Sequence, residues 1–134
     1  MKAKKSYNSK DKTLIISKAA IERKADNVVV MNMRKVTTMC DFFIVCSGNT
    51  DRKIKAIADN IIKELKKSAI RVGHIEGYNE ANWILIDCYD VIVHVFRQDL
   101  RDFYDLEHLW AEAPRKVITE KSVKKTRTRL YTTN

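Results

Sequence analysis

The chain has 134 residues, 45% of them hydrophobic, and a mean hydropathy of −0.37, which indicates one folded domain with an ordinary apolar core. No apolar run approaches the roughly 20 residues of a membrane-spanning helix, and the lysine-rich start is followed by no apolar stretch of the signal-peptide kind. A net charge of +9 would favour a nucleic-acid partner if it were evenly distributed.

The first third of the chain predicts one helix and two strands. Residues 1–12 are polar and basic without hydrophobic periodicity, so we expect a disordered segment. Thr13 can cap a helix over residues 13–25, where apolar residues form an imperfect stripe. Residues 27–31 and 42–46 are rich in side chains that favour strands. The second run is continuous rather than alternating, which indicates burial on both faces.

A strongly amphipathic helix is predicted over residues 51–68. Its isoleucine, alanine and leucine side chains recur with the 3.6-residue helical period, and Thr50 or Asn49 can cap its start. The opposite face is rich in lysine, which is typical of a solvated helix surface. Residues 72–77 follow as a loop or a short edge strand.

Residues 83–96 predict a pair of strands joined by a tight acidic turn at residues 87–90. Because side chains alternate along a strand, only one register places an apolar set in the core. We expect Ile84 and Ile86 to face inward. The more exposed face then carries Trp83, Leu85 and Asp87.

The folded body is predicted to end near Pro114. Residues 98–104 indicate a turn or short helix and residues 106–111 a further helical turn, and proline then interrupts regular structure. The order of elements over residues 13–114 favours an α/β domain with a mixed β-sheet and flanking helices. Residues 115–134 are dominated by lysine, arginine and threonine, so we expect a basic, flexible tail.

The positive charge lies mainly in the two predicted tails. Residues 1–12 carry +4 and residues 115–134 carry +6, which leaves −1 for residues 13–114. Within that body, residues 76–114 hold nine carboxylates against two arginines. An acidic surface repels phosphate and attracts a basic protein, whereas the basic tails could contact RNA non-specifically.

The three cysteines, Cys40, Cys46 and Cys88, form no C-x-x-C pair and are odd in number. Free buried thiols in a reducing compartment are the favoured interpretation, and the chain is expected to be cytoplasmic. No sequence feature selects a cysteine–histidine pair for nucleophilic catalysis.

Two further functions remain open as alternatives. Glu76, Asp87 and Asp90 could form a metal site of the nucleotidyltransferase type, because converging carboxylates bind hard cations. The paired acids that such enzymes place beside a Gly-Ser turn are missing, so we expect no catalytic residues, metal or cofactor. The other alternative is a general RNA-binding module that acts through the basic tails.

Six segments together resemble the Iojap-type ribosomal silencing factor family: DFFIVCSG at 41–48, KAIADN at 55–60, EG at 76–77, WILID at 83–87, DVIVHVF at 90–96 and FYDLEHLW at 103–110. The resemblance implies a nucleotidyltransferase-like α/β sandwich without the catalytic acids, and members often form homodimers. It also implies a translation repressor, not an enzyme, that binds the large ribosomal subunit. The implied partner is the fourteenth large-subunit ribosomal protein, where binding sterically blocks joining of the small subunit in nutrient limitation.

The predicted contact residues combine this resemblance with the acidic, aromatic-rich end of the body. They are Trp83, Leu85, Asp87, Tyr89, Asp90, Tyr104, Leu106 and Trp110. At Tyr89 the family usually has glycine. If that position requires a positive φ angle, the tyrosine must accept strain or the turn must change shape.

Overall fold

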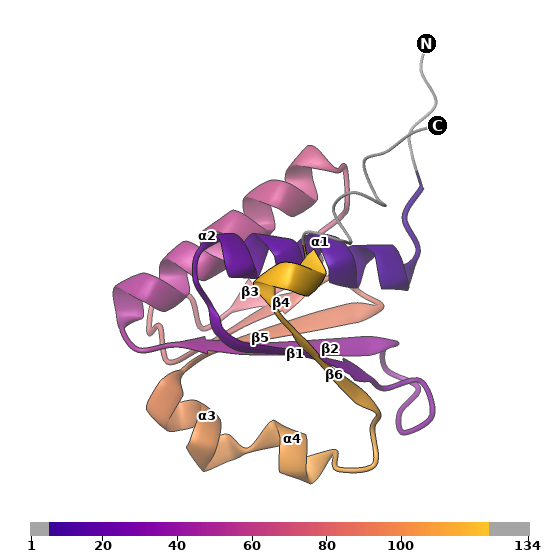
Figure 1. Cartoon of the computed structure of the whole chain (residues 1–134). Coiled ribbons are helices and arrows are strands. Elements are labelled where there is room, and N and C mark those ends of the chain that lie inside the picture. Colours follow the sequence, from indigo (N-terminus) through magenta and orange to yellow (C-terminus); the bar gives the residue numbers. More distant parts are fainter. Residues whose placement is uncertain (1–5, 124–134) are drawn as a thin grey trace.

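A computed structural model describes residues 6–123, in which one six-stranded sheet separates two helical layers (Figure 1). The strand order is β3-β4-β5-β2-β1-β6. The elements are α1 Ser9–Glu22, β1 Asp26–Asn32, β2 Phe42–Gly48, α2 Asp51–Lys67, β3 His74–Glu76, β4 Trp83–Asp87, β5 Val91–Arg97, α3 Gln98–Tyr104, α4 Leu106–Leu109 and β6 Arg115–Ile118.

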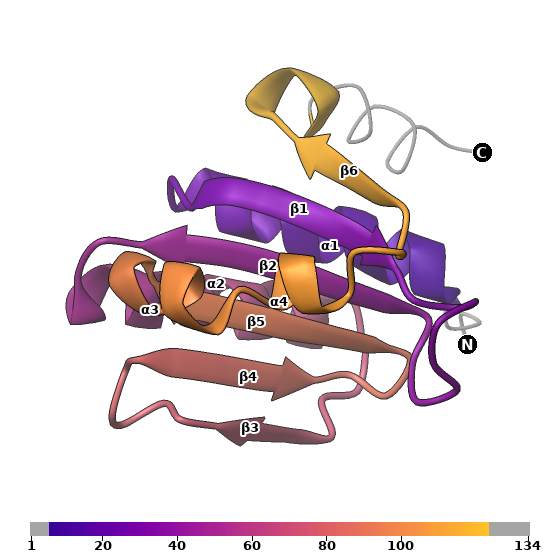
Figure 2. The same cartoon turned by 90° about the horizontal axis from the view of Figure 1, so that it is seen from below.

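The sheet is mixed, as the sequence predicted. Strands β2 and β5 pair in parallel, and every other neighbouring pair is antiparallel. Helices α1 and α2 cover one face of the sheet, which we call the upper face. Helices α3 and α4 lie on the opposite, lower face over β5 and β2, and leave β4 and β3 free of helices there (Figure 2).

The first helix begins earlier than predicted. Asn8 caps α1: its side chain accepts from the backbone N–H of Asp11, and the Asp11 carboxylate accepts from the backbone N–H of Asn8. This reciprocal cap displaces Thr13 as the start and brings Ser9–Lys12 into the folded body. Ser9 Oγ then donates to Asp41 at 2.8 Å. The prediction that residues 1–12 are disordered is therefore wrong for Ser9–Lys12. Residues 1–5 lie outside the described residues.

The folded body also extends past Pro114. Residues Arg115–Ile118 form β6, which pairs antiparallel with β1. The prediction of a flexible tail from residue 115 is thus wrong for its first part. Val117 and Ile118 are β-branched residues that favour strands, and the edge of β1 supplies the partner for pairing. Val123 beyond the strand is 9% exposed. Residues 124–134 lie outside the described residues.

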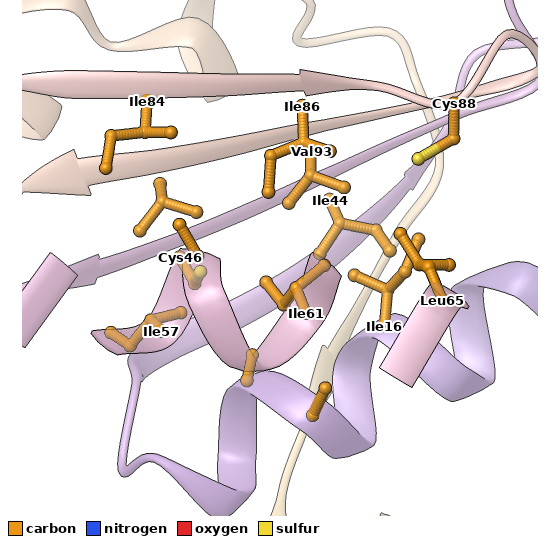
Figure 3. Packing of buried hydrophobic residues seen from close by; sticks show 14 of the residues in the cluster. Ile16, Ile44, Cys46, Ile57, Ile61, Leu65, Ile84, Ile86, Cys88 and Val93 are labelled. Carbon is orange, nitrogen blue, oxygen red and sulfur yellow. The ribbon is translucent and has the colours of Figure 1, made fainter. Parts of the chain in front are cut away.

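The upper face holds the larger core. Thr50 caps α2 by accepting from the backbone N–H of Lys53 at 3.1 Å, as predicted for this helix. Figure 3 shows α2 side chains meeting those of α1 and of the central strands in a closely packed layer. Ile57, Ile61 and Leu65 of α2 have no exposed surface. None of the helices in the described part of the chain is long and apolar enough to cross a bilayer.

Candidate protein-docking face

The register of β4 decides which side chains reach the lower face. Ile84 and Ile86 are fully buried in the upper core, whereas Trp83, Leu85 and Asp87 are half-buried on the other side. The predicted alternation is confirmed. The lower helices α3 and α4 lie over β5 and β2 rather than over β4 (Figure 2), and the lower face of β4 carries the half-buried Trp83 and Leu85.

Trp83 is held in one position by aromatic neighbours and one hydrogen bond. Its ring stacks on Phe96 at 4.8 Å between centroids and contacts Tyr104 at the same distance. The indole Nε1 donates to His94 Nδ1 at 3.1 Å. A tryptophan anchored in this way offers a rigid apolar surface with little side-chain entropy left to lose on binding.

His94 is a buried, neutral histidine. It is 4% exposed, and burial lowers its pKa from 6.5 to about 4. Because Nδ1 accepts the indole proton, the neutral ring carries its own proton on Nε2. That nitrogen has no hydrogen-bond partner among the described residues, and the ring lies 4.6 Å from the Phe43 ring in an edge-to-face arrangement.

Arg101 anchors α3 and α4 to the sheet. It is 6% exposed and forms a bidentate pair with Glu107 at 2.9 and 3.1 Å. Its guanidinium also donates to the Asn27 carbonyl at 2.7 Å and to Ser47 Oγ at 3.2 Å. One inward arginine therefore ties both short helices to β1 and β2. Sequence reasoning missed this role, because an arginine in a short helix is normally expected outside.

The inward position of Arg101 turns large apolar side chains toward solvent. Phe103 is 76% exposed, Tyr104 47% and Leu109 70%; we call these three residues the α3–α4 patch. Phe103 and Leu109 were both absent from the predicted contact set. Phe103 also packs edge-on against Tyr104, with centroids 5.1 Å apart.

Two predicted contact residues of this region are less accessible. Leu106 is 9% exposed and packs in the lower core, where it supports α4 and offers little surface to a partner. Trp110 is half-buried and packs edge-on against Phe43 at 6.3 Å. The accessible apolar surface therefore comes chiefly from the α3–α4 patch beside Trp83.

Carboxylates surround the α3–α4 patch. Residues 98–112 hold five of them against a single arginine, which is itself buried. The four that are exposed are Asp99, Asp102, Asp105 and Glu112. An apolar centre with an acidic rim is the usual anatomy of a surface that docks a basic protein.

The remaining predicted contacts lie at the far end of β4. Asp87 is four residues from Trp83, or about 13 Å along the strand. Asp90 binds Lys12 Nζ at 2.7 Å and so faces α1. Tyr89 is 53% exposed, has φ +72°, and lies under Arg71 at 6.0 Å. The structure therefore separates the predicted set into two groups. Of the two outcomes considered for Tyr89, the structure shows the tyrosine in the positive-φ conformation.

The carboxylates considered for a metal site do not converge. Glu76 and Asp87 both contact His74, whereas Asp90 binds Lys12. Among the described residues, no three His, Cys, Asp or Glu side chains form a cluster that could hold a metal ion.

The three cysteines are free and buried. Burial raises the pKa of the Cys40 thiol to about 11 and those of Cys46 and Cys88 to about 12. Each is therefore a protonated, unreactive thiol near neutral pH.

Comparison with known proteins agrees with this architecture. A family model described as "Ribosomal silencing factor during starvation" matches residues 6–134. A ribosomal silencing factor of Halalkalibacterium halodurans is 43% identical over 96 residues, which cover 72% of this chain and 82% of that protein. A crystal structure of a Chromobacterium violaceum protein matches with a TM-score of 0.77 and 28% identity, covering 78% of this chain and 88% of that one.

A more distant relative from Mus musculus is named mitochondrial assembly of ribosomal large subunit protein 1. It is 25% identical over 92 residues, which cover 66% of this chain and 40% of that protein. The family model, which spans nearly the whole chain, and the high identity to the bacterial relative together decide the assignment. This chain belongs to the ribosomal silencing factor family.

Proposed function

We propose that this chain represses translation by docking its α3–α4 patch on a basic protein of the large ribosomal subunit, and that its bulk there blocks joining of the small subunit. The observation that carries the proposal is the apolar patch of Phe103, Tyr104 and Leu109, exposed beside an immobilised Trp83 and rimmed by carboxylates. The fourteenth large-subunit ribosomal protein, implied by the family resemblance, is the proposed partner. The mechanism needs no reaction, because occupancy of the joining surface is sufficient.

The chemistry of the face supports a protein rather than RNA as this partner. Exposed aromatic and leucine side chains supply the apolar centre that protein interfaces use as energetic anchors. The exposed carboxylates would repel phosphate and orient a lysine- and arginine-rich surface. The name of the mouse relative, which refers to the large ribosomal subunit, is consistent with the same particle.

The proposal is tested by co-sedimentation of the full chain with purified large subunits. The double variant Phe103→Ala/Leu109→Ala removes two of the three apolar side chains of the patch. Both side chains are exposed, so the fold should be unaffected. We expect its affinity for the large subunit to fall by roughly 30-fold or more, the size of a hot-spot loss of about 2 kcal/mol. Met39→Ala is the matched control, since Met39 is 78% exposed but lies in the β1–β2 connection rather than on α3 or α4.

The same variants test the blocking step when both ribosomal subunits are mixed with the protein. The wild-type chain and Met39→Ala should reduce the amount of joined ribosome, and the patch variant should not. Equal co-sedimentation of the patch variant and the wild type would reject this face as the docking site. If a second copy of the chain covers the patch instead, the free protein will sediment as a dimer that the double variant converts to a monomer.

A further inference from the structure

The two layers of helices carry opposite charge. On the lower face, residues 98–112 hold five carboxylates and one buried arginine. On the upper face, α2 holds six lysines or arginines against three carboxylates. The sheet thus separates an acidic side from a basic side, and the docking proposed above uses only the acidic one.

The cations of α2 form a line along its outer surface. Arg52, Lys55, Lys63 and Lys66 lie on the side of the helix opposite its buried isoleucines, and we call them the α2 basic stripe. With a rise of 1.5 Å per residue, the stripe is about 21 Å long. Arg52, Lys63 and Lys66 are exposed. The one acidic residue within the line, Asp59, accepts a hydrogen bond from Tyr78.

The carboxylates of α2 do not neutralise this stripe. Asp51 pairs with Arg97 at 3.5 Å, outside the helix, and Glu64 pairs with Lys67 at 3.6 Å. Within the described part of the chain, no carboxylate lies within ion-pair distance of Arg52, Lys63 or Lys66. Their charges are therefore available to an external anion.

We propose that the α2 basic stripe contacts the phosphate backbone of RNA. The stripe presents a row of cations, and phosphate contacts require only positive charge at suitable spacing. A protein partner is disfavoured because none of the large exposed hydrophobic side chains of the described residues lies on α2, so the stripe lacks an apolar anchor. A membrane surface is disfavoured for the same reason, since there is no apolar side chain to insert.

This inference rests on the proposed function, because docking on the ribosome is what would bring the α2 basic stripe close to RNA. The stripe is on the face of the sheet opposite the docking patch, so both contacts can form together. The phosphate contacts would add affinity without sequence specificity and would make binding depend on salt.

The test measures binding of the full chain to an RNA duplex of about 16 base pairs by fluorescence anisotropy, at several salt concentrations from roughly 50 to 200 mM. The variant Lys63→Gln/Lys66→Gln removes two charges from the stripe without altering its buried face. We expect the slope of log affinity against log salt to become shallower by roughly 1.5, at about 0.7–0.9 per lost contact.

The control Lys35→Gln/Lys121→Gln removes the same charge from exposed positions outside α2. If both double variants change the slope equally, RNA binding depends on the net charge of the protein and not on the α2 basic stripe. An unchanged slope for the α2 variant would also overturn the inference. The patch variant Phe103→Ala/Leu109→Ala should bind the duplex like the wild type. The docking proposal is therefore tested by the patch variant on large subunits, and the RNA proposal is tested separately by the α2 variant on the duplex.

Discussion

The upper and lower faces of the sheet are covered to very different extents. On the upper face, helices of 14 and 17 residues bury a continuous apolar core. On the lower face, helices of seven and four residues cover a smaller core and leave aromatic and leucine side chains in solvent. The difference indicates a division of roles: the upper layer stabilises the fold, and the lower layer exposes the surface that another molecule can recognise.

The two faces also differ in how they hold their polar groups. In the upper layer the buried polar group is the neutral amide of Asn60, which donates to the Ala19 carbonyl at 2.8 Å and to the Glu22 carboxylate at 3.2 Å. The lower layer instead buries a guanidinium, Arg101, and an imidazole, His94. Groups of this kind are costly to bury and tolerate little change, so the lower layer is expected to respond most strongly to single polar substitutions.

The largest expected effect is that of Arg101→Ala. The change leaves Glu107, Ser47 and a backbone carbonyl without the donor they share, in a site where Ser47 is buried and Glu107 is only partly exposed. Urea unfolding should show a loss of about 3–5 kcal/mol. Arg97→Ala serves as the control, because Arg97 pairs with Asp99 at the surface, and its stability should stay near that of the wild type. Equal effects of the two substitutions would show that the lower layer does not depend on the buried guanidinium.

A cavity in the upper core should have a slightly smaller effect. Ile61 is fully buried between α2 and the sheet (Figure 3), and Ile61→Ala is expected to cost about 2–5 kcal/mol in the free energy of unfolding. Leu109→Ala on the lower face should leave stability almost unchanged, since its side chain is in solvent. The proposed division of roles predicts the opposite for affinity to the large subunit. Leu109→Ala should bind more weakly than the wild type, whereas the folded Ile61→Ala protein should bind equally well.

His94 makes the lower layer sensitive to acid. Its pKa is about 4 in the folded protein against 6.5 for a free histidine, so between these values the unfolded chain binds more protons. Stability should therefore be unaffected by His94 above pH 6.5 and should fall by about 3 kcal/mol as the pH drops toward 4. In His94→Gln this part of the pH dependence should vanish, as measured by urea unfolding at several pH values. His108→Gln should retain it, because His108 is exposed.

Much of the upper layer could be predicted from the sequence, and much of the lower layer could not. The period of the α2 residues, the cap at Thr50 and the alternation in β4 all follow from local patterns that tertiary packing reinforces. Arg101 breaks such a pattern. A charged residue in a short helix is normally expected at the surface, whereas the structure buries Arg101 and leaves Phe103 exposed. The cause is a long-range set of acceptors on Asn27, Ser47 and Glu107, and no short window of sequence contains all three.

The two ends of the body were mispredicted for a similar reason. The start of α1 depends on a short capping motif at Asn8 that lies in a lysine-rich stretch resembling a tail. The strand β6 has only two apolar residues, Val117 and Ile118, within a stretch dominated by lysine, arginine and threonine, and it pairs with the edge of β1, which is distant in sequence. Composition alone separates such segments poorly from solvated tails, because pairing with an existing edge supplies the structure that local propensity does not.

The smallest expected effect concerns Tyr89, which adopts a φ of +72°. A side chain in this region costs about 1–2 kcal/mol, and glycine removes that cost but gives the unfolded chain more freedom. Tyr89→Gly should therefore raise stability by no more than about 1 kcal/mol. Tyr89→Ala separates the causes, because it keeps the strained backbone and loses the contacts of the ring with Arg71 and Gly73. If thermal unfolding shows glycine to be no more stable than alanine, the turn stores no strain at this position, and the ring contacts alone explain why tyrosine is tolerated there.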